Sequence, residues 1–329
     1  MHQAATFLTV LLALAPLASA SDATLLDLIM PDAKVVFGAN VSRILASPLG
    51  KSFTGKEPQV AAALAGFTAA TGFNLARDLE EILVATTGGS KNAPTLVVLR
   101  GIFDKERVRA FAKSNGATAT TYNGLEMYSG ARNMGTDKVS GAFAVIDQSI
   151  AVGGQLEQVR AAIRNRSQGS KISADLGRKI AALSENYDIW AVSLAPASGL
   201  TSRFDDSKPD MTAEMLKAIE QFSGGLKFGD GFEFAAEILS HTERDAEKLG
   251  GGLQTLVALL QSDPRTKCPD CLKVTVKDVT VHVSLIVPAS VIQQNLQARN
   301  QPRVVVPPNT DIVIQSSPGD MGTVKLAQP

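Results

Sequence analysis

The 329-residue sequence is poor in the residues that build familiar catalytic centres. It holds 2 cysteines and 3 histidines. It contains no Gly-x-Ser-x-Gly nucleophile elbow, no Ser-x-x-Lys pair and no His-Glu-x-x-His metal motif. The Gly-Gly-Ser-Lys run at 88–91 is only a fragment of a phosphate-binding loop. We therefore assign no catalytic, cofactor-binding or metal-ligating residue, and the sequence favours a function other than catalysis.

The sequence also lacks an excess of charge of either sign. It has 32 basic and 32 acidic residues, which give a formal net charge of zero. Nucleic-acid binding usually requires a basic surface, so we expect no nucleic-acid partner. Aromatic residues make up 5% of the chain, which is a poor composition for stacking on sugars or bases. The 45% of hydrophobic residues is enough to build packed cores.

The N-terminus has the pattern of an export signal. An apolar run over 4–15 is about twelve residues long, whereas a membrane-spanning helix needs about twenty. The small residues Ala18, Ser19 and Ala20 follow, and they predict cleavage between Ala20 and Ser21. We therefore expect a periplasmic or extracellular protein whose mature chain begins at Ser21. No second apolar run is long enough to span a membrane.

The two cysteines form the most informative local motif, Cys268-Pro-Asp-Cys271. In an exported protein this pair is expected to be oxidised, which favours a local structural disulfide. A thioredoxin-type redox pair would need a helix after the first cysteine, whereas 272–276 has the pattern of a strand. A zinc site would need two further ligands, for which the mature chain offers only His241 and His282, and neither has zinc-finger spacing.

The two halves of the chain show the same order of patterns, which predicts an internal repeat. Each half has a short helix, a strand, a helix, a hairpin, a helix, a second hairpin and a closing helix. In the first half these segments begin at Thr24 and include 33–41, 59–70, 81–87 with 94–103, a helix capped by Asp104, 142–146 with 149–153, and 156–164. In the second half they are 175–183, 188–194, 213–222, 225–228 with 232–239, a helix capped by Thr242, 272–276 with 279–287, and 289–298.

Hairpins imply antiparallel pairing, and helices are interspersed with them. The pattern therefore predicts an α+β fold made of two similar antiparallel-sheet units, each with helices packed on one face. We expect a signal peptide over 1–20, a first unit over 21–168 and a second unit over 169–300. The proline-rich segment 301–329 is expected to be an extended or partly disordered tail.

Several short segments resemble a family of uncharacterised exported bacterial proteins of the acidobacterial type. The matching segments lie mainly in the first half, at 28–33, 38–41, 47–50, 72–74 and 77–79. The resemblance implies export and an unassigned function, and it supplies no catalytic residues.

Three functions are compatible with these observations. The first is an exported, non-enzymatic binding or interaction protein that holds a protein or small-molecule ligand in a cleft between its two units. The second is an exported enzyme or thiol-disulfide redox protein that uses Cys268 and Cys271. The third is a structural component of the cell envelope, in which the tail from Arg299 adds a strand to a neighbour.

Overall fold

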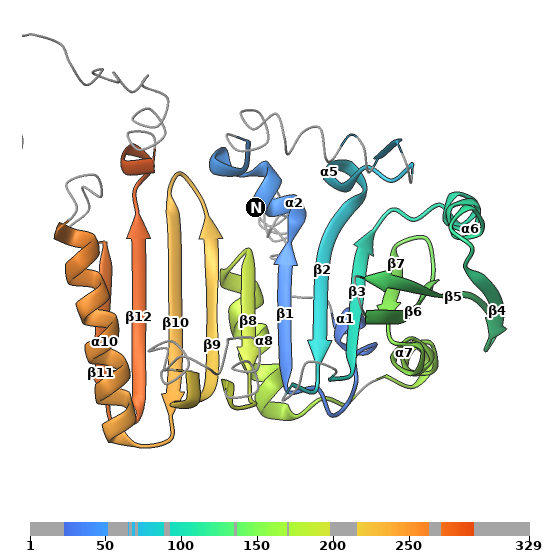
Figure 1. Ribbon diagram of the computed structural model, residues 1–329. Coiled ribbons are helices and arrows are strands. Elements are labelled where there is room, and N and C mark those ends of the chain that lie inside the picture. Colours follow the sequence, from blue (N-terminus) through green and yellow to red (C-terminus); the bar gives the residue numbers. More distant parts are fainter. Residues whose placement is uncertain are drawn as a thin grey trace, which may run out of the picture.

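The structure is a computed structural model, and it describes residues 23–51, 65, 68–69, 72–88, 93–134, 137–169, 171–197, 216–262 and 271–292. Its strands form one antiparallel sheet of 12 strands, in the order β11-β12-β10-β9-β8-β1-β2-β3-β7-β6-β5-β4. Figure 1 shows these strands side by side, with α10 in front of β11 at one end of the sheet and β4 at the other. The predicted α+β class is confirmed.

The described elements of the first half are helices interspersed among strands and hairpins. They are α1 (Ala23–Leu26), β1 (Val35–Asn40), α2 (Val41–Ala46), α5 (Leu75–Asp78), β2 (Leu79–Thr86), β3 (Thr95–Gly101), α6 (Lys105–Ser114), β4 (Thr118–Tyr122), β5 (Leu125–Met134), β6 (Asp137–Val145), β7 (Ile150–Gly154) and α7 (Leu156–Gln168). The predicted cap of α6 is present, because the Asp104 carboxylate accepts from the backbone N–H groups of Glu106 and Arg107.

The described part of the second half has fewer strands and a longer helix than that of the first. Its elements are α8 (Ala174–Asn186), β8 (Ile189–Ser193), β9 (Ile219–Phe228), β10 (Phe232–Ser240), α10 (Glu243–Ser262), β11 (Leu272–Lys277) and β12 (Thr280–Val287). Thr242 caps α10 as predicted, since its hydroxyl accepts from the N–H of Asp245 at 3.1 Å.

The strand orders of the two halves correspond when each is read outward from the centre of the sheet. The first half runs β1-β2-β3-β7-β6, and the second runs β8-β9-β10-β12-β11. In both, a hairpin follows the central strand, and a helix then leads to a second hairpin that packs beside the first. The first half differs by the additional hairpin β4–β5 at its outer edge.

The central pairing of β1 with β8 joins the two units into one sheet, where the sequence predicts a sheet in each unit. Gly38 lies directly opposite Trp190. The ladder is extended at both ends, because Asn40 N–H donates to the Asp188 carbonyl at 2.7 Å and Leu194 N–H donates to the Lys34 carbonyl at 2.8 Å. Each half thus contributes one donor and one acceptor beyond the ends of the paired strands.

The main hydrophobic core lies on one face of this sheet. In antiparallel pairs, residues directly opposite each other point to the same face. Trp190 shares its face with Gly38 and Gly225. On this face α1, α7 and α8 bury Leu25, Val159 and Ile180 against strand residues such as Leu83, Val98 and Trp190.

A second, smaller core lies on the opposite face. On this face Ala236 of β10 lies opposite Gly224 of β9 and Val283 of β12. Gly224 is one residue before Gly225, which faces Trp190, so these side chains point away from the Trp190 face. Helix α10 packs on this face, where Ala246 and Leu249 are buried. Helices α8 and α10, which are consecutive among the described helices, therefore cover opposite faces of the sheet.

Two parts of the fold differ from the sequence predictions. The predicted helix over 213–222 is wrong at its C-terminal end, because β9 begins at Ile219 and pairs there with β10. The hairpin β4–β5 was not predicted. The predicted helix over 59–70, the end of the closing helix beyond 292, the signal peptide and the tail lie outside the described residues, apart from isolated positions. Among the described helices, none is both long enough and apolar enough to cross a membrane.

We predict that Gly38→Ala lowers the free energy of unfolding by about 1–3 kcal/mol. A Cβ at this position would overlap the Trp190 ring and push β1 away from β8. Gly130→Ala in β5 is the matched control, since the nearest atom to its added Cβ is the Ala117 Cα at 3.9 Å. Urea unfolding of both variants checks the prediction. Equal stability of the two variants would contradict the tight packing at Gly38.

Candidate functional site

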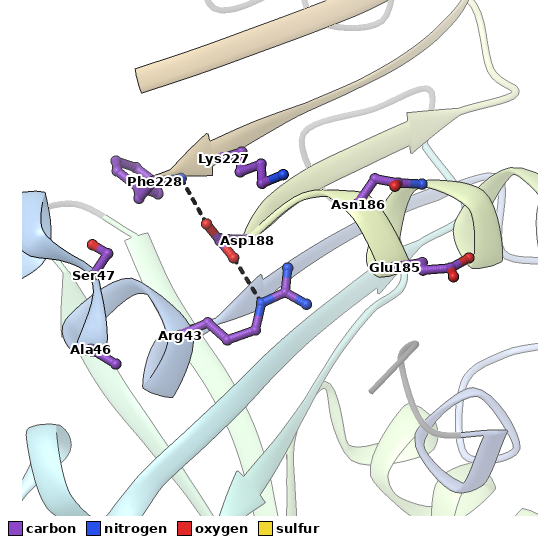
Figure 2. Close-up of a pocket in the computed structure, with 8 residues that line it drawn as sticks. All are labelled: Arg43, Ala46, Ser47, Glu185, Asn186, Asp188, Lys227 and Phe228. Carbon is purple, nitrogen blue, oxygen red and sulfur yellow. Dashed lines mark hydrogen bonds and ion pairs between the residues drawn. The ribbon is translucent and has the colours of Figure 1, made fainter. Parts of the chain in front are cut away.

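An open pocket of about 420 Å³ lies where the two halves of the chain meet. Helix α2 of the first half forms one wall, and the end of α8, the start of β8 and the end of β9 form the other. The lining residues are Arg43, Ala46, Ser47, Glu185, Asn186, Asp188, Lys227 and Phe228. Figure 2 shows these side chains arranged around Asp188.

The corner between β1 and α2 positions Arg43. Asn40 is the last residue of β1 and also caps α2, which begins at the next residue. Its side-chain oxygen accepts from the Arg43 backbone N–H at 2.9 Å. The helix ends at Ser47, whose hydroxyl donates to the Ile44 carbonyl at 2.7 Å and accepts from Gly50 N–H at 2.9 Å. Both turns are fixed by side-chain hydrogen bonds, so Arg43 points towards the second half (Figure 2).

Asp188 is a buried acid that connects three elements. It is 5% exposed and sits directly before β8. Its Oδ1 accepts from Arg43 Nε at 2.7 Å, and its Oδ2 accepts from the Phe228 backbone N–H at 2.7 Å. Arg43 Nη2 also donates to the Tyr187 carbonyl at 2.9 Å. A buried carboxylate is tolerated only when paired and hydrogen-bonded, and here the partners come from both halves.

Of the remaining lining residues, Ala46 and Phe228 are apolar and Ser47 is buried, whereas the other three are polar and accessible. Lys227, Glu185 and Asn186 are exposed, and Asn186 Nδ2 donates to the Ala182 carbonyl at 2.8 Å. Arg43 and Asp188 compensate each other's charge, so Lys227 and Glu185 supply one accessible charge of each sign. Such a lining suits a small polar or charged ligand better than an apolar one.

A smaller pocket of about 190 Å³ lies beside α5 and the start of α6. Its buried group is Asp78, which is 5% exposed. The Arg77 guanidinium donates to this carboxylate and holds its pKa below the usual value, and the N–H of Asn74 at 2.8 Å adds to that effect. Across the pocket, Arg107 Nη1 donates to the Gly72 carbonyl at 3.1 Å. Asp78 thus has an ion-pair partner next to it in sequence, unlike Asp188.

The structure bears only partly on the residues that the sequence singled out. Cys268, Ala20 and Ser21 lie outside the described residues, so the Cys268–Cys271 disulfide and the cleavage site stay predictions. Cys271 directly precedes β11, and its carbonyl accepts from Ile286 N–H at 2.8 Å. No group of three or more His, Cys, Asp or Glu side chains arranged to hold a metal occurs among the described residues.

His241 and His282 each lie beside a glutamate. His241 Nδ1 is 3.8 Å from Glu220, and His282 Nδ1 is 4.0 Å from Glu237. Both histidines are about half exposed, with side-chain exposures of 44% and 47%. Neither lines the junction pocket.

Sequence patterns did not identify Arg43 and Asp188. One signal was present, namely an acid placed directly before a buried strand. Its significance depends on a partner 145 residues away, and periodicity or motif spacing carries no information on such a pair.

We predict that a double-mutant cycle on Arg43→Ala and Asp188→Ala gives a coupling energy of at least about 1 kcal/mol in chemical unfolding, because each change leaves the other group without its charged partner. The control is Arg178→Ala with Asp175→Ala on α8, a pair whose side chains are 73% and 49% exposed. We expect less than about 0.5 kcal/mol there. Equal couplings would contradict a structural role for the Arg43–Asp188 pair.

We predict that Asp78 contributes stability that is lost in acid. Its pKa is lower in the folded than in the unfolded chain, so its contribution is present above the unfolded pKa of about 3.9 and disappears as the pH falls through the folded value. Unfolding free energies measured from pH 7 to pH 2.5 should fall less steeply below about pH 4 for Asp78→Asn than for the wild type. Parallel curves would show that the carboxylate is not stabilised by folding.

Comparison with known proteins identifies a fold and no family. No protein-family model matches the chain, and no curated protein is similar to it in sequence. Among solved structures, crystal form III of TP0453 aligns with a TM-score of 0.52 and 8% identity, over 83% of this chain and 97% of that chain. Crystal form I of TP0453 aligns with a TM-score of 0.48 and 9% identity, over 83% and 96%. The chain therefore shares the α+β fold of TP0453 over nearly the whole of that protein.

Proposed function

We propose that this chain is an exported, non-enzymatic binding protein that holds a small polar or charged ligand in the pocket between its two halves. The observation that carries the proposal is the composition of the pocket walls. One wall is α2 of the first half, the other is α8, β8 and β9 of the second, and the ion pair of Arg43 with Asp188 connects the two walls. Pockets at the interface between units are preferred ligand sites.

The corresponding strand orders support two repeated units, over 21–168 and 169–300, as the origin of this arrangement. In such a chain the pocket arises where two copies of one architecture meet. The two walls therefore carry different side chains, with Arg43 on one and Glu185 and Lys227 on the other. A ligand with both an anionic and a cationic group would find a partner for each.

The state of the polar groups favours binding over chemistry. Both oxygens of Asp188 already accept hydrogen bonds, one from the Arg43 side chain and one from the Phe228 backbone N–H. The Ser47 hydroxyl donates to a backbone carbonyl of its own helix. Lys227 is exposed and its side chain takes no part in the hydrogen bonds of Asp188, so it can contact a ligand without disturbing the Arg43–Asp188 pair.

Export is supported by the pattern of the first twenty residues, with its short apolar run and its small-residue box ending at Ala20. A periplasmic or extracellular localisation suits a protein that captures a ligand outside the cytoplasm. Secretion of a reporter fused after Ser21, and its loss when 4–15 are deleted, would test this part.

We predict that Lys227→Ala weakens ligand binding by about tenfold or more without a change in unfolding free energy, because Lys227 is exposed and supplies the accessible positive charge of the pocket. Thermal-shift screening of the wild type with amino acids, dipeptides, organic acids and sugar phosphates would find the ligand, and calorimetry would compare the variants.

Lys273→Ala is the matched control, since Lys273 is an exposed lysine on β11 outside the pocket. Equal affinity of the wild type and both lysine variants would place the ligand elsewhere. Catalytic turnover of a compound that binds in this pocket would contradict the non-enzymatic part of the proposal.

A further inference from the structure

Among the described residues, the two edge strands of the sheet, β11 and β4, differ in how they are protected. At one edge, β11 carries the exposed lysines Lys273 and Lys277, and Gln254 of α10 donates to the Val274 carbonyl at 3.4 Å. Charged side chains and covering helices are the usual means by which edge strands avoid pairing with other chains. At the other edge, β4 has the sequence Thr-Ala-Thr-Thr-Tyr, with no charge, no proline and four exposed residues out of five.

The hairpin geometry shows which backbone groups of β4 point outward. Asn123 and Gly124 form the two-residue turn to β5 with φ values of 47° and 76°, as in a type I′ turn. In such a hairpin the residues flanking the turn exchange backbone hydrogen bonds, so Tyr122 bonds to Leu125 and Thr120 to Met127. The alternate residues, Ala119 and Thr121, direct their N–H and C=O groups away from β5.

Contacts to α7 hold this edge in place. Arg164 Nη1 donates to the Tyr122 hydroxyl at 2.8 Å, and the Arg160 guanidinium lies 5.6 Å from the centre of the Tyr122 ring. At the other end, Ala117 N–H donates to the Ala112 carbonyl at 3.0 Å and ties the start of β4 to the end of α6. The outward groups therefore form an ordered row, which lowers the entropy cost of pairing with another strand.

We propose that β4 pairs with β4 of a second copy of this chain, in antiparallel orientation about Thr120. In this register Ala119 of one copy faces Thr121 of the other, and the two outward-pointing residues exchange a pair of hydrogen bonds. The two-fold axis repeats this pair, so the joint has four backbone hydrogen bonds. Thr120 faces its own symmetry mate at a non-hydrogen-bonded position, where cross-strand threonine pairs are favourable.

The sequence of β4 favours a second copy over an unrelated peptide. Antiparallel self-pairing places like residues opposite each other, which is unfavourable for charged strands but not for this uncharged one. The chain already uses the same kind of joint internally, since β1 and β8 pair antiparallel at the centre of the sheet. A two-fold axis closes the assembly at two copies.

The joint is small, so the dimer is expected to be weak. Pairing of two five-residue edges buries much less than the ~1,200–2,000 Å² of a stable complex. We therefore expect a dissociation constant on the order of 10 to 100 µM, with the sheet extended across both copies.

Sedimentation equilibrium of the purified wild type, Thr121→Pro and Thr121→Val tests the proposal. Proline removes the outward N–H of Thr121 in both copies and leaves the β4–β5 ladder intact, so dimerisation should weaken by about tenfold or more. Valine keeps that N–H and the β-branched shape, and it should dimerise like the wild type. Circular dichroism and thermal unfolding verify that the variants are folded.

Cysteine cross-linking gives an independent readout that does not depend on the proline variant. Thr120→Cys should form a covalent dimer under mild oxidation, because Thr120 faces Thr120 of the other copy at about 4.5 Å between Cα atoms. Ala119→Cys, displaced by two residues from its own mate, should cross-link much less. A monomeric wild type at 200 µM, a dimer unaffected by Thr121→Pro, or equal cross-linking at both positions would overturn the proposal.

Discussion

The backbone pairing of β1 with β8 is the contact on which the rest of the structure depends. It joins segments about 150 residues apart and turns two sets of hairpins into a single sheet. The close approach requires Gly38, because the Trp190 ring occupies the space where a side chain would lie. Since α2 follows β1 and α8 precedes β8, the same pairing brings both walls of the pocket together. The pocket therefore exists only while this joint is intact.

The ion pair of Arg43 with Asp188 follows from that geometry. The pairing of β1 with β8 brings the largely buried Asp188 next to α2, and burial of an unpaired charge would be costly. Arg43 and the Phe228 N–H supply the missing interactions. The pair therefore fixes the position of α2 relative to β8 and β9. Because its two charges compensate each other, Lys227 and Glu185 are the charges available to a ligand.

Much of the fold could be predicted from the sequence because its signals are local. Alternating apolar residues and Gly or Asp turns marked four hairpins, and Asp104 and Thr242 marked two helix starts. The β4–β5 hairpin escaped prediction, because β4 is a polar, threonine-rich strand with little hydrophobic alternation. Its Asn-Gly turn at Asn123 was the available signal.

The predictions could not reach features that depend on contacts between distant residues. Nothing in the sequence of β1 alone indicates that its other neighbour is β8, or that Arg43 meets Asp188. The placement of α8 and α10 on opposite faces arises in the same way. It follows from the strand register, because the residues buried under α8 and those buried under α10 alternate along the same strands and so point to opposite faces.

The separation of β1 from β8 has a consequence for synthesis of the chain. Gly38 emerges from the ribosome 152 residues before Trp190 (190 − 38), which at ordinary translation rates is roughly 8 to 30 s. During that interval the apolar strand Val35–Asn40 can pair with β2 on one side while its other side has no native neighbour. A first half that folds before the second is available is thus a sheet whose strand β1 has one unpaired edge, and such an edge can pair with other chains until β8 occupies it.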